Sequence, residues 1–167
     1  VVHEQSDDLG ESIGRYQKSL REKGLPDIPF HATPLLNGHD AYEGMDVATR
    51  KGLFSAFRVF FRQLPIRYGL VVLRTREYAT LEDVAAAMRR GIVDILFDNL
   101  AYLQGFNRVK IYYDDGQQSI ASALHKAIDY ALSKNAVTYR PASAADYRLS
   151  QAADYICTAE LTALKYQ

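Results

Sequence analysis

The chain has 167 residues, of which 48% are hydrophobic and 24% charged, and its 20 basic side chains balance 20 acidic ones. This composition is that of an ordinary globular domain, and the length is sufficient for one buried core. Because the formal net charge is zero, overall electrostatics predict neither nucleic acid nor a membrane as a partner, and any such contact must depend on a local patch.

The cysteine content and the chain ends give further bounds. The single cysteine, Cys157, cannot form an internal disulfide, which is typical of a reducing, cytoplasmic compartment. No run approaches the roughly 18 apolar residues of a membrane-spanning helix, so a membrane is not an expected partner. The chain begins at Val1 and ends within a helical pattern. We therefore expect one α/β domain over residues 1–167, truncated at both ends.

Hydrophobic periodicity predicts helices alternating with strands along the chain. In order, we expect the end of a strand at residues 1–3, a helix at 9–23, a loop or short extended segment at 28–38, a helix at 46–64, a strand at 66–73, a helix at 81–103, a strand at 108–113, a helix at 117–133, a short strand at 136–140 and a helix at 146–166. Pro65 is expected to end the helix at 46–64, and Thr80 with Asp83 resembles a capping box at the start of the helix at 81–103. The strand at 66–73 is almost continuously apolar, which predicts that both its faces are covered. The alternation favours an α/β sheet with helices packed against it.

Two acidic residues stand where many folds hold a divalent metal. Asp114 follows a predicted buried strand, within the sequence RVKIYYDDG, and Asp154 lies on the last predicted helix. Hard carboxylate oxygens from a strand end and a packed helix are ligands that Mg²⁺ prefers, and Mg²⁺ can activate water and stabilise charge on a phosphate. The alternative interpretation is that Asp114, Asp115 and Gly116 form an ordinary turn.

The last helix offers a second polar group beside its acid. Gln151 and Asp154 fall on one stripe at helical spacing. One interpretation makes Gln151 a donor that orients Asp154 and lies close to substrate. The other makes both residues part of a solvated face. Ala152 and Ala153 flank the acid and favour close packing of this helix, which supports the first interpretation.

His31 lies in a proline-rich stretch and is a third candidate site residue. A histidine can serve as a general acid, a metal ligand or a phosphate contact. We expect its ring to open toward the same cleft as the two acids. The alternative is a purely structural loop histidine. Arginines such as Arg58, Arg62 and Arg67 provide a local basic patch for phosphates, or simply a charged outer helix face.

Several stretches together resemble the bacterial family known as domain of unknown function 3800. The resemblance rests on Phe30-His31, residues 50–54, residues 111–117 and residues 147–154, and it covers nearly the whole chain. Its most specific part is the tyrosine-tyrosine-aspartate sequence paired with glutamine-x-alanine-aspartate. It implies a ribonuclease H-like mixed sheet with helices packed against it. Members begin with a strand bearing an aspartate-glutamate-serine-glycine motif, which is missing here, so one metal carboxylate is expected to be absent.

The resemblance and the two acids together predict a metal-dependent phosphodiesterase, a nuclease acting on nucleic acid. Asp114 and Asp154 would hold Mg²⁺ or Mn²⁺ with their carboxylates about 4–8 Å apart. Gln151 would support them and His31 would contact substrate or transfer a proton. A second hypothesis is a catalytically silent binding or protein-interaction module on the same fold, since one fold hosts many activities. The sequence does not distinguish DNA from RNA or fix the oligomeric state.

Overall fold

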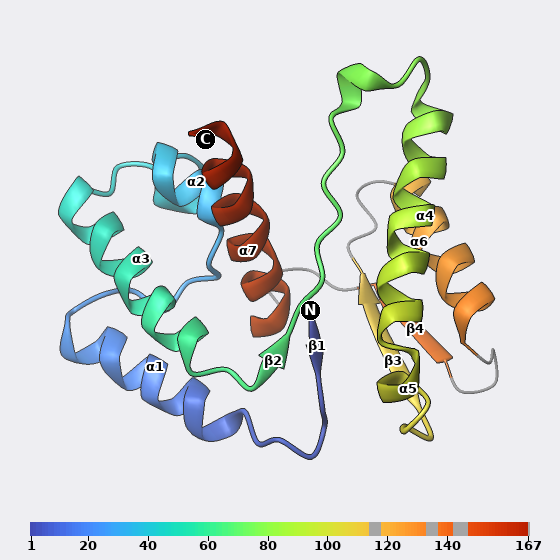
Figure 1. Cartoon of the computed structure of the whole chain (residues 1–167). Helices are drawn as coiled ribbons and strands as arrows, with labels where there is room; N and C mark the ends of the chain where they lie inside the picture. The colour runs from blue at the N-terminus through green and yellow to red at the C-terminus, as the bar shows by residue number, and fades with distance from the viewer. Residues whose placement is uncertain (114–117, 133–136, 142–146, 167) are drawn as a thin grey trace. The chain divides into compact units, whose positions relative to one another are not determined.

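The computed structural model describes residues 1–113, 118–132, 137–141 and 147–166 (Figure 1). The chain forms two compact units, the first from Val1–Tyr68 with Ala144–Gln167 and the second from Gly69–Ser143. Within the described ranges the protein is a mixed α/β chain, mostly helical, with two small two-stranded sheets. The predicted α/β class is confirmed in this coarse form, and the ribonuclease H-like arrangement stays a prediction.

The first unit is mainly helical. Its elements are β1 (Val2–His3), α1 (Gly10–Glu22), α2 (Ala32–Asn37), a 3₁₀ turn (Asp40–Tyr42), α3 (Val47–Arg62), β2 (Ile66–Arg67) and α7 (Arg148–Lys165). β1 and β2 pair antiparallel, with Val2 opposite Arg67. The prediction of a loop or short extended segment over 28–38 was wrong for most of its length, because residues 32–37 form α2. A six-residue helix is too short to show clear periodicity, and its Pro34 falls in the first turn, where a missing N–H is tolerated.

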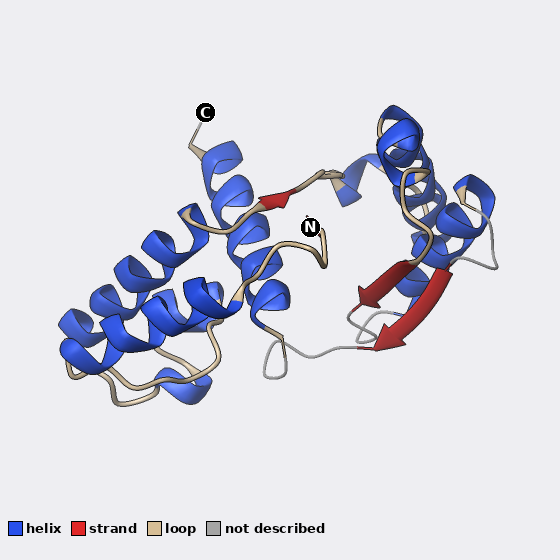
Figure 2. Ribbon diagram, turned by 90° about the horizontal axis from the view of Figure 1, so that it is seen from below, coloured by secondary structure: helices blue, strands red, loops and turns tan. Residues whose placement is uncertain are grey.

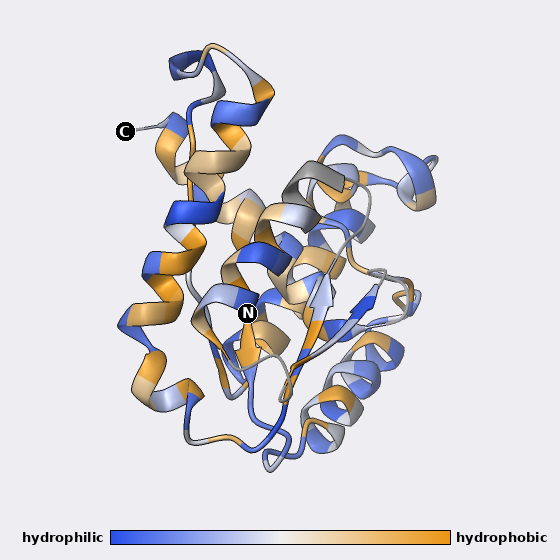
Figure 3. Ribbon diagram, turned by 90° about the vertical axis from the view of Figure 1, so that its right-hand side faces the viewer, coloured by the Kyte–Doolittle hydropathy of each residue, from blue (hydrophilic) through white to orange (hydrophobic). Residues whose placement is uncertain are grey.

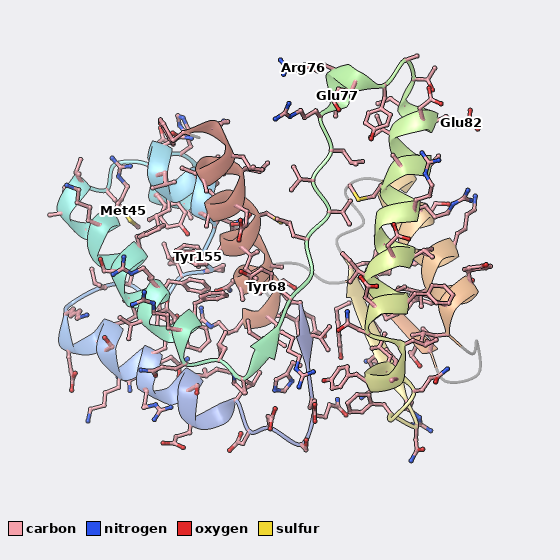
Figure 4. The ribbon with its side chains drawn as sticks, viewed as in Figure 1. Met45, Tyr68, Arg76, Glu77, Glu82 and Tyr155 are labelled. Atoms are coloured by element: carbon pink, nitrogen blue, oxygen red, sulfur yellow. The ribbon has the colours of Figure 1, made fainter. Side chains whose placement is uncertain are left out.

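Aromatic side chains build the core of the first unit. Its buried residues come largely from α1, α3 and the segment around α2: Tyr16, Leu20, Phe30, Ala32, Leu35, Tyr42, Leu53, Ala56, Phe57, Phe60, Leu64 and Ala152. Phe30 stacks on Phe57 with ring centroids 3.8 Å apart. Tyr155 reaches from α7 toward α3, where its ring lies 4.9 Å from that of Phe61 (Figure 4). Because each buried aromatic contributes roughly 2–3 kcal/mol, these contacts hold α7 against α2 and α3.

The second unit combines helices with a parallel pair of strands. Its elements are a 3₁₀ turn (Thr75–Glu77), α4 (Leu81–Asp98), α5 (Leu100–Leu103), β3 (Val109–Tyr113), α6 (Gln118–Ala131) and β4 (Val137–Pro141). The predicted capping box starts α4: Thr80 Oγ1 accepts from the N–H of Asp83 at 3.1 Å, and Asp83 accepts from the N–H of Thr80 at 3.1 Å. The predicted single helix over 81–103 was wrong, because it breaks at Asn99 into α4 and α5.

The two strands of the second unit run side by side in the same direction (Figure 2). Val109 lies opposite Val137 and Tyr113 lies opposite Pro141, so the strands are paired over their full lengths. The helices α4 and α6 pack against each other. Apolar and polar stretches alternate along the helices (Figure 3), as expected when one face of each packs inward.

The prediction of a covered strand over 66–73 was largely wrong. Only Ile66–Arg67 forms a strand, and Leu70 and Val72 are 36% and 41% exposed. The segment instead runs close to α4, where a Cβ atom added at Gly91 would lie only 2.7 Å from Val71 Cγ1. A short apolar run indicates burial but does not tell whether a strand or a helix will be the neighbour.

Among the described residues, none of the helices is long and apolar enough to cross a membrane.

Candidate functional site

The junction of α2 and α7 brings Asp154 beside the chain at His31. Asp154 Oδ2 accepts a hydrogen bond from the backbone N–H of Ala32, with an N···O distance of 2.7 Å. Ala32 is the first residue of α2, so its N–H has no partner within that helix. His31 occupies the preceding N-cap position, but its side chain makes no capping hydrogen bond. The carboxylate of Asp154 therefore takes the capping role from a distant helix and places these two predicted site residues together.

A buried tyrosine fixes the backbone of His31. Tyr42 Oη accepts from the N–H of His31 at 2.8 Å and donates to the carbonyl oxygen of Pro29 at 2.7 Å. Burial raises the pKa of Tyr42 above its ordinary value; the hydrogen bond from His31 opposes this shift, and the negative charge of Asp154 adds to it. The phenol of Tyr42 therefore stays protonated and keeps the hydroxyl hydrogen that it donates to Pro29. The side chain of His31 is exposed rather than packed in an apolar interior.

Gln151 lies one turn before Asp154 and is buried, at 1% exposure. Its Oε1 accepts from Arg148 Nη1 at 3.1 Å. Arg148 also forms an ion pair with Asp27, and its guanidinium carbon lies 5.3 Å from the centroid of the Tyr16 ring. Burial raises the pKa of Tyr16 to about 12, although the positive charge of Arg148 opposes the shift. A side chain this deeply buried does not present itself to a substrate, and its predicted support of Asp154 stays a prediction.

Asp114, the other predicted metal ligand, lies outside the described residues. The described part of β3 ends at Tyr113, the residue directly before it. β3 belongs to the second unit and Asp154 to the first. The predicted separation of about 4–8 Å between the two carboxylates therefore stays a prediction.

One carboxylate oxygen of Asp154 retains the capacity to bind a cation. Oδ2 is engaged by the N–H of Ala32, whereas Oδ1 accepts no hydrogen bond from any residue that the structure describes. A carboxylate oxygen is a hard ligand that suits Mg²⁺ or Mn²⁺. Within the described ranges, however, no group of three or more His, Cys, Asp or Glu side chains could hold a metal ion. Asp154 fits such a site as one ligand, and further ligands must come from elsewhere.

Sequence reasoning missed two residues that shape this region. Tyr42 holds the backbone of His31, and Arg148 links the start of α7 to Asp27 and Gln151. Arg148 stands inside the stretch 147–154 that carries the family resemblance, which was a usable signal. Tyr42 carried none, because its partners lie 11 and 13 residues away along an irregular segment.

No protein-family model, no curated protein and no solved structure matches the chain.

Proposed function

We propose that this chain is a metal-dependent phosphodiesterase acting on nucleic acid, on a ribonuclease H-like fold that resembles domain of unknown function 3800. In this proposal Asp114 and Asp154 are the metal ligands, and His31 contacts the substrate phosphate or transfers a proton. The observation that carries it is the placement of Asp154: its Oδ2 binds the N–H of the residue that follows His31. Asp154 and the exposed residue His31 therefore lie close together, although they are 123 positions apart in the sequence.

The residues at this location have complementary chemistry. Mg²⁺ or Mn²⁺, when bound, would activate water and stabilise charge on the phosphate. Asp154 would contribute Oδ1 while Oδ2 stays on the N–H of Ala32, which fixes the orientation of the carboxylate. His31 would donate a proton or a hydrogen bond to the leaving oxygen, because an imidazole can serve as a general acid. Tyr42 would hold the backbone of His31 in place, and the residue's exposure leaves its ring accessible to a phosphate.

The proposal is tested by calorimetric Mn²⁺ titration beside cleavage of single- and double-stranded DNA and RNA. We expect weak Mn²⁺ binding, since two carboxylates provide few ligands and Mg²⁺-type ions then keep several waters. Asp114→Asn and Asp154→Asn should each abolish both the binding and any cleavage. His31→Ala should lower cleavage about 100-fold or more while leaving Mn²⁺ binding unchanged, because general acid catalysis contributes about 10²–10⁴-fold.

Asp94→Asn is the matched control, because Asp94 is an exposed acid on α4 with no role in the proposal. It should leave Mn²⁺ binding and cleavage at the level of the unmodified chain. If Asp94→Asn weakens Mn²⁺ binding as much as Asp154→Asn does, the metal is held by diffuse surface charge and the proposed site is wrong.

A second candidate is a catalytically silent binding or protein-interaction module. The observation that favours it is that the structure already explains both polar residues of the glutamine-x-alanine-aspartate stretch. Asp154 caps α2 and Gln151 accepts from Arg148 in the interior. A chain that keeps these contacts for stability alone would neither bind Mn²⁺ nor cleave any of the four substrates, and that result would favour the module.

A further inference from the structure

The parallel pair β3–β4 has one face turned to α6 and one face turned away from it. Tyr139 on β4 donates from its Oη to Asp129 Oδ1 of α6 at 2.9 Å, and the ring of Tyr113 on β3 lies 4.6 Å from that of His125 in the same helix. Successive strand residues point to opposite faces of a sheet. The residues that alternate with Tyr113 and Tyr139 along the two strands, among them Tyr112, therefore lie on the opposite, outer face.

The outer face carries positive charge and an aromatic ring. Lys110, Thr138 and Arg140 are exposed, and Tyr112 is 41% exposed. The register places Tyr112 beside Arg140 and Lys110 beside Thr138, on strands that run about 4.8 Å apart. Arg108, also exposed, directly precedes β3. Neither strand contains an aspartate or a glutamate, so the strands themselves provide no charge that would neutralise these cations.

We propose that the outer face of β3–β4 binds single-stranded nucleic acid. Lys110 and Arg140 contact backbone phosphates, and Tyr112 stacks on an unpaired base. Positively charged surfaces with aromatic side chains bind single strands in this way, because every base has a π-face and every linkage carries a phosphate. An acidic peptide such as polyglutamate would contact the cations but has no aromatic ring to stack on Tyr112, and a duplex keeps its bases stacked on one another.

This inference deepens the proposed function and rests on it for its catalytic meaning, since Asp114 directly follows the last residue of β3. The binding itself does not depend on metal, so it is measurable when no cleavage takes place.

The experiment measures fluorescence anisotropy of labelled DNA and RNA single strands of about 12 nucleotides, a length within the usual range of such sites. The full chain is used in EDTA, over a series of salt concentrations. Tyr112→Ala should weaken binding about five-fold or more, the lower end for loss of one stacked base, and Tyr112→Phe should change it less than about two-fold. Lys110→Ala with Arg140→Ala should reduce the slope of log affinity against log salt by about 1.4, or about 0.7 per lost phosphate contact.

The matched control removes two exposed charges elsewhere, by Lys18→Ala with Arg21→Ala on α1. This variant should keep the affinity and the salt slope of the unmodified chain. The inference is overturned if the α1 variant loses as much affinity as the β3–β4 variant, if Tyr112→Ala has no effect, or if polyglutamate or a duplex competes as well as the single strand. A chain that binds in EDTA but never cleaves would keep this inference and refute the nuclease. A chain that cleaves nucleic acid while the outer-face variants bind normally would support the nuclease and refute this inference.

Discussion

Replacing Asp154 with alanine should lower the free energy of unfolding by about 2 kcal/mol. The carboxylate accepts a 2.7 Å hydrogen bond from the N–H of Ala32, a residue with 0% exposure. A hydrogen bond to a charged group contributes about 1.5–3 kcal/mol, and a buried N–H left without a partner costs a similar amount. Asp154→Asn should cost about 1 kcal/mol or less, because the amide oxygen still accepts this bond.

The measurement is urea denaturation followed by far-UV circular dichroism, since the chain has no tryptophan. Thr162→Ala is the control on the same helix, because Thr162 is exposed and its hydroxyl donates to the helix carbonyl of Thr158; we expect a change within about 0.5 kcal/mol. Hydrogen exchange of the Ala32 amide should also become faster in Asp154→Ala than in Thr162→Ala, because that amide loses its acceptor.

If Asp154→Ala changes stability no more than Thr162→Ala, the contact with Ala32 does not hold α2 against α7. If the stability falls but the exchange of the Ala32 amide stays slow, another group must protect that amide, and the capping role assigned to Asp154 is wrong. Equal losses in Asp154→Ala and Asp154→Asn would mean that the negative charge, rather than the hydrogen bond, carries the effect.

Three further predictions concern stability. Gly91→Ala should destabilise the protein by about 1–3 kcal/mol on thermal melting in spite of better helix propensity, because the new Cβ would lie 2.7 Å from Val71 Cγ1; an unchanged or raised melting temperature would contradict this close contact. Thr80→Ala should cost about 1 kcal/mol in urea by removing the capping box with Asp83, and a loss below about 0.3 kcal/mol would show that the box does not stabilise α4. The free energy of unfolding should fall between pH 10 and about pH 12, because unfolded Tyr16 loses its proton near pH 10 while burial raises its folded pKa to about 12; Tyr16→Phe should reduce this fall, and an unchanged pH profile would refute it.

Local sequence signals predicted the helices well where periodicity and boundary residues agreed. The capping box at Thr80 and Asp83 starts α4 as expected, and Pro65 follows shortly after α3 ends at Arg62. These features depend on neighbours within a few residues, which a single sequence contains. β3, expected over 108–113, forms over Val109–Tyr113, where exposed Lys110 and Tyr112 alternate with less exposed residues.

The sequence was insufficient to predict elements that depend on contacts between distant segments. The segment 66–73 was apolar enough for a covered strand, but the close approach of Val71 to Gly91 depends on a helix about 20 residues later. α2 depends on Asp154, 122 residues away, for its cap, and on Tyr42 for the conformation of the residue before it. Propensity cannot predict a helix whose N-terminal partner comes from another part of the chain.

The capping role and the metal-binding role of Asp154 are compatible in geometry but differ in their need for charge. Capping uses Oδ2 as an acceptor for the N–H of Ala32, and an amide oxygen can replace it. Metal binding needs an anionic oxygen, and an amide is a much poorer ligand for Mg²⁺ or Mn²⁺. Asp154→Asn therefore separates the two roles: a nuclease would keep most of its stability and lose Mn²⁺ binding and cleavage, whereas a binding module would have no metal-dependent property to lose. Asp154→Ala would lower the stability of a nuclease and of a binding module alike, so its effect on stability would not distinguish the two.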